Sequence, residues 1–255
     1  MNGTSTNNSV QSVERALNIL LIIADETLPV SIARIVECSG LNRTTVWRLL
    51  VTLEDCGFVE KDPISKGYLL GYNASRLCSD IMDNYAPLIR LAKPYMDKLL
   101  DEINEDILLT VPRFGGMLTI YQLHSDNAVL IRDYSMMLSQ FHSSSNGKIY
   151  LSFLEPEELD VILSQPLEKT TPYTITDPSK LRKEIEQCRR ENCGFTLEEN
   201  GVGENGFSIP ILYQEKPYAF LNVSGPSFRF TEEKMRQYVP LVQKICKDME
   251  EKLIH

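Results

Sequence analysis

The sequence predicts an α+β protein in two parts: a small helical domain with a hairpin, and a larger domain built on an antiparallel sheet. Three observations support this fold class. Residues 12–55 follow helical periodicity in three short segments, and the period then changes to a strand–turn–strand pattern over 58–71. From residue 106 onward, strand patterns are flanked by helical patterns at both ends, as in a sheet covered by helices.

The composition is that of an ordinary globular protein. The chain has 255 residues, of which 43% are hydrophobic and 24% charged, so it can bury one large core or two ordinary ones. No apolar run is long enough to cross a membrane, and the opening segment MNGTSTNNSV lacks the pattern of a secretion signal. We therefore expect a cytoplasmic protein with no membrane contact.

Charge and cysteine usage exclude several other classes. The net charge of −9 argues against a protein that coats nucleic acid or anionic membranes non-specifically. The six cysteines and three histidines are scattered, without a C-x-x-C pair or the spacing of a zinc site. We expect reduced thiols, no metal and no cofactor.

Cap residues mark three short helices near the start of the chain. Ser12 is the expected N-cap of the first helix, and Ser31 is the N-cap of a second that ends at Gly40. Asn42 caps a third helix, which ends near Asp55. The short gap between the second and third helices is typical of two helices that cross at a steep angle.

The third helix has one apolar side and one polar, cationic side. The apolar side follows helical spacing and is expected to be core: Val46, Leu49, Leu50 and Leu53. The outward N-terminal half carries Arg43, Thr44, Thr45, Trp47 and Arg48. Hydroxyl and guanidinium groups at a helix N-terminus can contact phosphates and base edges, which indicates a helix that enters the major groove of DNA.

A hairpin completes the unit. FVEKD and GYLLG flank a Pro63–Lys66 turn, so three helices are followed by two short strands, the order of a winged helix-turn-helix. Lys66 would then contact the DNA backbone or minor groove. The alternative is a small structural domain of the same shape, but the outward chemistry favours DNA binding. The expected DNA contacts are Ser31, Asn42, Arg43, Thr44, Thr45, Trp47, Arg48 and Lys66.

A new helical pattern begins at Asn73 and joins the two parts. Pro87 and Pro94 interrupt it, so we expect two helical segments rather than one rod. The first segment could help to pair subunits. The expected domains are 1–72, a linker helix over 73–84, and 85–255.

The second part alternates strands and helices. ILLTV, MLTIYQL and AVLIRDY read as strands joined by hairpin turns, and the serine-rich HSSSNGKIYLSFL leads into a helix. Helices are expected at 155–164 and 178–192, then the strands GFTL, FSIPILY and YAFLNVSGP, then a last helix capped by Thr231. Asn200–Gly203 is either a flexible turn or a ligand lid.

Three segments together resemble the IclR-type family of bacterial transcriptional regulators over essentially the full length. SVERALNIL with GLNRTTVWRLLVTLEDCGFVEKDP is similar to the family's winged-helix start. FHSSSNGKIYLSFL resembles its His-x-x-x-x-Gly-Lys block, and GFTLEENGVG with YAFLNVSGP resembles its last strands. The resemblance implies a GAF-like C-terminal domain that binds a small organic acid, sugar acid or aromatic molecule. It also implies homodimers or homotetramers on a double-stranded DNA operator.

Matching positions give the effector-binding residues that the resemblance implies. These are Ser144, Ser145, Asn146, Glu198, Asn205, Asn222 and Ser224. Backbone amides of Ser145 and Asn146 at a helix start would also suit an anion. Departures from the family pattern in the serine loop and the last strand mean that the ligand of known relatives cannot be assumed.

The leading hypothesis is a ligand-responsive transcriptional regulator, which we expect to be a repressor and not an enzyme. A small-molecule hydrolase or transferase with an appended helical domain is the alternative, but a nucleophile and base are hard to find among three histidines. His142 is expected to be structural, and Lys148 lacks the glycine spacing of a phosphate loop. A third hypothesis is a ligand-binding adaptor that never touches DNA.

Overall fold

The chain folds as two compact units that meet between Asn84 and Tyr85. The structure is a computed structural model that describes residues 10–253, with the backbone alone described at 78–83. Helix α4 (Tyr72–Ile103) runs through the boundary between the units, and each unit has an apolar core of its own. Helices and an antiparallel sheet are combined as the sequence predicts, which confirms the fold class.

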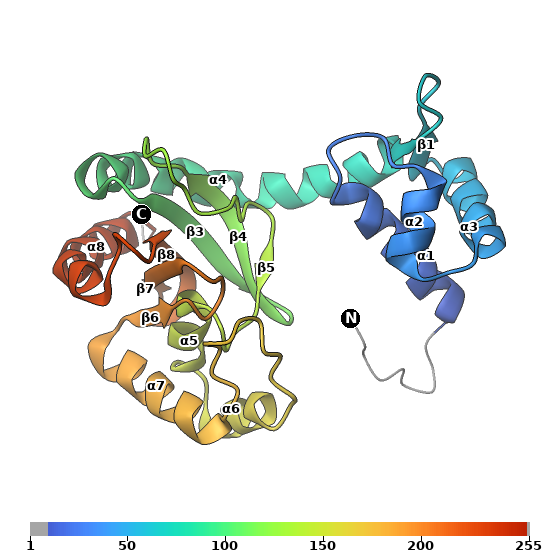
Figure 1. The fold of residues 1–255 in the computed structure, drawn as a ribbon. Helices are drawn as coiled ribbons and strands as arrows, with labels where there is room; N and C mark the ends of the chain where they lie inside the picture. The colour runs from blue at the N-terminus through green and yellow to red at the C-terminus, as the bar shows by residue number, and fades with distance from the viewer. Residues whose placement is uncertain (1–9, 254–255) are drawn as a thin grey trace. The chain divides into compact units, whose positions relative to one another are not determined.

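The N-terminal unit has the predicted order of three helices and a hairpin (Figure 1). Its elements are α1 (Gln11–Ala24), α2 (Ile32–Ser39), α3 (Arg43–Asp55), β1 (Val59–Lys61) and β2 (Tyr68–Leu70). Fully buried Ile19, Ile35, Val46 and Leu50 form the centre of its core. The hairpin strands pair antiparallel, and Val30 extends them by exchanging backbone hydrogen bonds with Tyr68.

Helix caps explain where these helices begin and end. Ser31 accepts a hydrogen bond from the Arg34 amide at 3.3 Å, and Gly40 ends α2 in the left-handed conformation. The predicted Ser12 cap is wrong. The carbonyl of Val10 already accepts hydrogen bonds from two amides in the first turn, so α1 starts at Gln11 and Ser12 lies inside it.

Helix α4 is continuous from Tyr72 to Ile103, so the predicted break at Pro87 and Pro94 is wrong. Both prolines lie on the exposed side of the helix, where water can satisfy the carbonyl that each leaves without an amide partner. The opposite side is buried in the core of the C-terminal unit through residues such as Leu88, Ala92 and Met96. Burial of this side outweighs two lost backbone hydrogen bonds.

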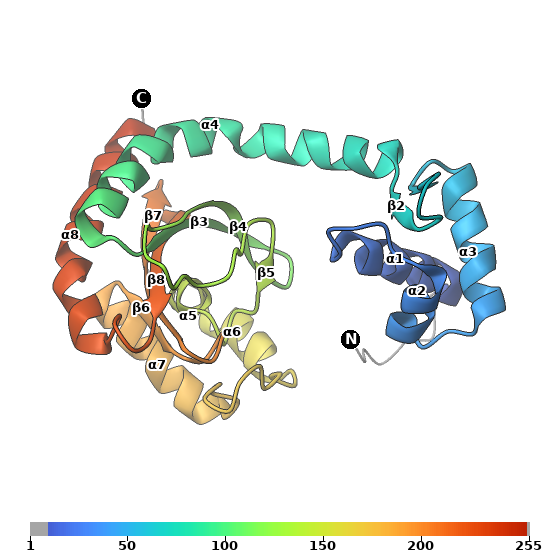
Figure 2. The ribbon, with the colours of Figure 1, turned by 45° about the horizontal axis from the view of Figure 1, so that its top comes forward.

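The C-terminal unit is built on one antiparallel sheet. Its strands are β3 (Asp106–Arg113), β4 (Gly116–Leu123), β5 (Leu138–Ser139), β6 (Gly194–Leu197), β7 (Glu204–Tyr213) and β8 (Lys216–Pro226). Within the described residues their order is β5-β4-β3-β8-β7-β6. Helix α8 (Glu232–Leu253) and the end of α4 cover one face, and α5 (Ser145–Leu151) lies on the other (Figures 1 and 2).

The helices of the second face match the predicted positions. Helix α6 runs over Pro156–Leu163 and α7 over Pro178–Glu191, and they share an apolar cluster with α5. Thr231 caps α8 as predicted, because its hydroxyl accepts a hydrogen bond from the Lys234 amide at 3.4 Å. Over residues 10–253, none of the helices is both long and apolar enough to cross a membrane. The same residues contain no cluster of metal-ligating side chains.

The predicted strand at 128–134 is wrong. Residues 124–137 contain neither helix nor strand. The side chain of Gln122 on β4 binds this segment in place of a strand ladder, because it accepts from the Tyr134 amide at 2.8 Å and donates to the Arg132 carbonyl at 3.2 Å. The segment therefore leaves the sheet edge, and Ile131 and Tyr134 pack on Leu108.

Candidate functional site

The outward side of α3 is exposed along its N-terminal half. Arg43, Thr44 and Arg48 are exposed, Thr45 is partly buried, and Trp47 is 55% exposed. The Asn42 side chain accepts from the Thr45 amide at 2.9 Å, which fixes the start of the helix. Exposed cations and hydroxyls therefore surround the positive end of the helix dipole, on the side opposite the buried core.

Nearby charges on α2 do not extend this cationic surface. Arg34 pairs with Glu26 at 3.3 Å and with Glu37 at 3.1 Å. These hydrogen bonds raise the pKa of its guanidinium. Ser31 is exposed, but its hydroxyl also serves as the N-cap of α2.

The hairpin tip is a compact turn. The Asp62 carboxylate accepts from both the amide and the hydroxyl of Ser65, each at 2.6 Å, and these bonds lower its pKa. Lys66 is exposed and adopts a positive φ of 61°. Lys61 lies on the same hairpin with its Nζ 5.7 Å from the centre of the Tyr68 ring. Lys61 is not among the DNA contacts predicted from the sequence, although its place in the strand next to the turn is a signal for it.

A second site lies in the C-terminal unit, between the inner face of the sheet and the serine loop. Five of the seven predicted effector residues meet around one small cavity: Ser144, Ser145, Asn146, Asn222 and Ser224. Its free volume is about 30 Å³. A water molecule needs roughly 10–15 Å³ of such space, so the cavity has room for only about two or three waters.

Close backbone approach builds the serine loop. The hydroxyl of Ser144 donates to the Gln140 carbonyl at 2.7 Å and accepts from the Gly147 amide at 3.2 Å, which starts α5. A Cβ on Gly147 would lie 2.2 Å from the Phe141 carbonyl oxygen, and one on Gly194 would lie 2.1 Å from that of Ser145. Glycine is therefore required at both positions for α5 to reach the sheet.

Side chains of the inner sheet face form a polar floor under the cavity. Asn146 donates to the Thr110 hydroxyl at 3.0 Å, and the Ser208 hydroxyl donates to the Asn222 carbonyl at 2.5 Å. All four residues are buried. Buried polar groups need partners to be stable, and this network supplies them.

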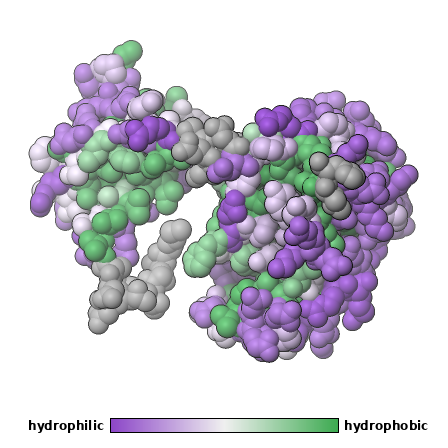
Figure 3. Space-filling view, turned by 180° about the vertical axis from the view of Figure 1, so that it is seen from behind, coloured by the Kyte–Doolittle hydropathy of each residue, from purple (hydrophilic) through white to green (hydrophobic). Residues whose placement is uncertain are grey.

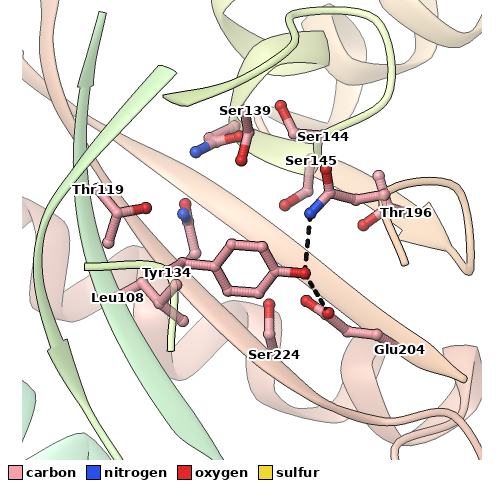
Figure 4. A pocket seen from close by; sticks show the side chains of 12 residues that line it. Leu108, Thr119, Tyr134, Ser139, Ser144, Ser145, Thr196, Glu204 and Ser224 are labelled. Atoms are coloured by element: carbon pink, nitrogen blue, oxygen red, sulfur yellow. Dashed lines mark hydrogen bonds between the residues drawn. The ribbon is translucent and has the colours of Figure 1, made fainter. Parts of the chain in front are cut away.

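Two residues at the centre of the cavity, Tyr134 and Glu204, are not among the effector residues predicted from the sequence. The Tyr134 ring crosses the cavity, and its hydroxyl donates to Glu204 Oε2 at 2.5 Å (Figure 4). Asn200 Nδ2 donates to the same hydroxyl oxygen at 3.1 Å. Tyr134 lies in the segment that reads as a strand, and Glu204 is the neighbour of Asn205, so neither position drew attention.

Burial perturbs both groups. It raises the pKa of the Glu204 carboxyl to about 7, although the Tyr134 hydrogen bond and the charge of Arg132 act in the opposite direction. Burial and the nearby Glu204 charge raise the pKa of the Tyr134 phenol well above its usual value. The phenol therefore keeps its proton and acts as the donor to Glu204.

The structure does not bring the other two predicted residues to the cavity. Asn205 lies on the opposite face of β7, where its amide donates to the Phe230 carbonyl at 2.9 Å. Alternation along the strand turns its neighbour Glu204 to the cavity instead. Glu198 accepts from the Gly203 amide at 2.7 Å, a contact within the turn between β6 and β7.

Lys148 and His142 support the framework around the loop. Lys148 is fully buried, and its Nζ donates to Glu199 at 2.7 Å and to Glu184 at 3.3 Å, which joins α5 to α7 and to the segment after β6. His142 Nε2 donates to the Glu168 carbonyl at 2.8 Å. Two carboxylates thus neutralise the charge of Lys148, and its ammonium group does not face the cavity.

The raised pKa of Glu204 predicts a specific pH dependence of stability. Its carboxyl titrates near 4.5 when unfolded and about 7 when folded, so between these values the folded state holds a proton that the unfolded state has released. The free energy of unfolding then falls as pH rises through this window. Glu204→Gln should remove this loss of unfolding free energy, which we expect to be about 3 kcal/mol across the whole window.

Urea unfolding of the wild type and Glu204→Gln, followed by far-UV circular dichroism on both sides of this window, measures the difference. If the free energy of unfolding changes equally with pH in the wild type and in the variant, the proposed protonation of the buried Glu204 carboxyl is contradicted.

Comparison with known proteins assigns both halves of the chain. The model for the bacterial transcriptional regulator IclR C-terminal domain matches residues 83–251, and the IclR helix-turn-helix model matches 12–63. The transcriptional repressor IclR of Escherichia coli (strain K12) is 25% identical over 254 residues, with 94% of this chain and 89% of the relative covered. The regulator KdgR of Dickeya chrysanthemi is 26% identical over 249 residues, with 96% and 80% covered.

Solved structures show the same architecture. The IclR protein of Thermotoga maritima superposes with a TM-score of 0.72 at 25% identity, covering 96% of this chain and 99% of that one. An IclR homologue from Microbacterium hydrocarbonoxydans, solved in complex with 4-hydroxybenzoate, gives a TM-score of 0.73 at 20% identity, with 94% and 99% covered, and this likeness shows the fold alone. The named relatives are transcriptional regulators and not enzymes. The chain belongs to the IclR family and is a DNA-binding transcriptional regulator with a C-terminal effector domain.

Proposed function

We propose that this regulator acts in the cytoplasm as a homodimeric repressor, with α3 in the major groove of an operator and a small organic effector in the cavity of the C-terminal unit. The observation that carries the proposal is the two-sided character of α3. Its N-terminal half exposes Arg43 and Arg48 with no acid before Glu54, while Val46 and Leu50 behind them are fully buried.

The DNA contacts follow from this placement. Arg43 and Arg48 would reach base edges, and Thr44 and Thr45 would contact phosphates at the helix start. Ser31, Asn42, Trp47 and Lys66 complete the proposed surface, and Lys61 adds a second cation on the hairpin. Because the net charge of the chain is −9, binding depends on these few placed groups rather than on a general positive field.

A homodimer would present two such helices to successive major grooves. An apolar stripe on α1 supports self-association, because Val13, Leu17 and Leu21 are 53%, 55% and 52% exposed. Figure 3 shows hydrophobic side chains gathered on this part of the N-terminal unit. Exposed apolar patches of this kind mark interaction surfaces. A homotetramer would need a further contact between C-terminal units.

The proposed domains are the DNA-binding unit 1–72, the linker 73–84 and the effector unit 85–255. The division of the chain between Asn84 and Tyr85 supports the second boundary. The proposed effector site comprises Ser144, Ser145, Asn146, Asn222 and Ser224 around the cavity. An effector bound there changes DNA affinity only if it binds the two DNA-binding states with different affinity.

Removing either arginine of α3 should weaken operator binding. We expect Arg43→Ala and Arg48→Ala each to lose about 1–3 kcal/mol if they contact bases. Fluorescence anisotropy with a duplex from upstream of the protein's own coding sequence measures this. Arg190→Ala, the same change at an exposed position of α7, is the control. Wild-type affinity in both α3 variants would contradict the placement, and absence of any salt-dependent binding would favour the adaptor hypothesis.

Charge on the α1 stripe should break the proposed dimer. Leu17→Glu with Leu21→Glu is expected to yield monomers, because two carboxylates would have to be desolvated at the interface. Sedimentation velocity measures the mass, and Val161→Glu on the exposed side of α6 is the matched control. A double variant that retains the wild-type mass would place the interface elsewhere.

An effector should raise the melting temperature by mass action. A thermal-shift screen of organic acids, sugars and aromatics should yield ligands that stabilise the folded state by about 2.7 kcal/mol at a hundredfold excess over Kd. Ser145→Trp should abolish the shift by filling the cavity, whereas Ser164→Trp on the exposed end of α6 should not. Hits that stabilise Ser145→Trp as strongly as the wild type would show that they bind elsewhere.

A further inference from the structure

The cavity of the C-terminal unit is already occupied by a side chain of the protein. Tyr134 is 3% exposed, and its ring lies across the space between the serine loop and Glu204 (Figure 4). What remains is a free volume of about 30 Å³. An organic effector cannot enter while the ring is there, so binding requires Tyr134 to leave.

The segment that carries Tyr134 is attached in a way that allows this. Backbone hydrogen bonds join residues 124–137 to β4 at the end of the segment, where Thr119 pairs with Met136 and Met137. Further back, at Arg132 and Tyr134, the Gln122 side chain makes the bonds to the backbone. Arg132 and Val129 of the segment are exposed. Segments with few backbone bonds and exposed side chains open at low free-energy cost.

Apart from Leu108, the walls that remain are polar, and they carry no positive charge. Ser144, Ser145, Asn146, Thr196, Asn222 and Ser224 offer hydroxyls and amides. Among the described residues that line the cavity there is no lysine, arginine or histidine, and Glu204 is the only carboxyl group. Arg132 lies outside, 4.5 Å from the centre of the Tyr134 ring, and would move away with the segment.

Glu204 dictates what a replacement ligand must offer. Its carboxyl group now accepts a hydrogen bond from the Tyr134 hydroxyl, and Asn200 donates a hydrogen bond to the oxygen of that hydroxyl. A buried carboxyl left without a donor is costly, so the incoming ligand must supply one. When Glu204 is ionised, a ligand carboxylate would meet a like charge without a cation. A ligand ammonium would lose its hydration for a site in which one carboxyl is the only charged partner. Hydroxyl groups suit Glu204 and the polar side chains of the other walls.

We propose that Tyr134 is an internal ligand of the effector site, and that the effector which displaces it is a neutral polyhydroxylated molecule, of the polyol or sugar class, that donates a hydroxyl to Glu204 in place of the phenol. This rests on the cavity being the effector site, as proposed above. The position of Tyr134 makes it a specificity determinant as well as a barrier, because only a ligand that replaces its hydrogen bonds gains from displacing it.

The Tyr134→Ala variant tests whether Tyr134 is an internal ligand, with a small-molecule probe that mimics the missing side chain. p-Cresol should raise the melting temperature of full-length Tyr134→Ala, because it refills the vacated space and restores the donor to Glu204. It should not stabilise the wild type or Tyr213→Ala, the same change at an exposed hairpin position. Absence of a p-cresol effect specific to Tyr134→Ala would overturn the internal-ligand proposal.

Three compounds with one carbon skeleton test the ligand class. D-glucitol, D-gluconate and 1-amino-1-deoxy-D-glucitol differ only in a terminal hydroxyl, carboxylate or ammonium. In Tyr134→Ala, calorimetric titration should give a Kd for gluconate and for the amine at least roughly tenfold higher than for glucitol. In the double variant Tyr134→Ala with Glu204→Gln, the Kd values for glucitol and gluconate should differ by a smaller factor than in Tyr134→Ala alone.

Tyr134→Phe provides a second test in case Tyr134→Ala does not fold, because it keeps the ring and removes only the hydroxyl. It should bind glucitol roughly two- to tenfold more tightly than the wild type, since the closed state has lost a hydrogen bond. Preference for gluconate or the amine, or no glucitol binding, would overturn the ligand class. If p-cresol still binds, the cavity stands as a ligand site, so the proposed function survives that failure.

Discussion

The alternation of apolar and polar residues along the central strands is the constraint on which the C-terminal unit depends. Ile107 and Leu109 of β3 face the core shared with α4 and α8, whereas Leu108 and Thr110 face the serine loop. On β8, Leu221 and Val223 face the core while Asn222 and Ser224 face the cavity. One face of the sheet thus holds the unit together, and the other can hold polar groups in a fixed arrangement.

Polar groups on the inner face are stable because they bind one another. Thr110, Asn146, Ser208 and Asn222 form one network, and Lys148 is neutralised by two carboxylates behind the same loop. A network of this kind is rigid, since each missing partner would leave a buried polar group unsatisfied. The proposed displacement of Tyr134 therefore involves its own segment and not the floor beneath it.

Local patterns in the sequence were sufficient for the shorter helices, the hairpin and most strands, but not for the continuity of α4 through its two prolines. Caps such as Ser31, Asn42 and Thr231 act within one helical turn, so they can be recognised from neighbouring residues. The error at 128–134 has a different origin. Its β-rich residues read as a strand, but Gln122 makes the bonds that a neighbouring strand would have made, and such a long-range substitution has no local signal.

The same reasoning explains why the site was only partly predicted. Ser144 and Ser145 lie in a motif, and Asn222 and Ser224 share one side of a strand, so they could be selected. Tyr134 depends on the misread segment. Asn205 was selected where Glu204 faces the cavity, because an error of one residue turns a side chain to the other side of the sheet.

Adjacent residues on one strand connect the proposed effector cavity to the core beneath α4. Leu108 lies in the cavity wall, while Ile107 and Leu109 pack in the same core as Leu88 and Ala92 of α4. Close-packed cores do not deform freely, so a shift of β3 at Leu108 is felt by the residues that pack on α4. The proposed departure of Tyr134 would remove one apolar partner of Leu108. The strand itself would then provide a short physical route from the proposed ligand site to the helix that leads into the DNA-binding unit.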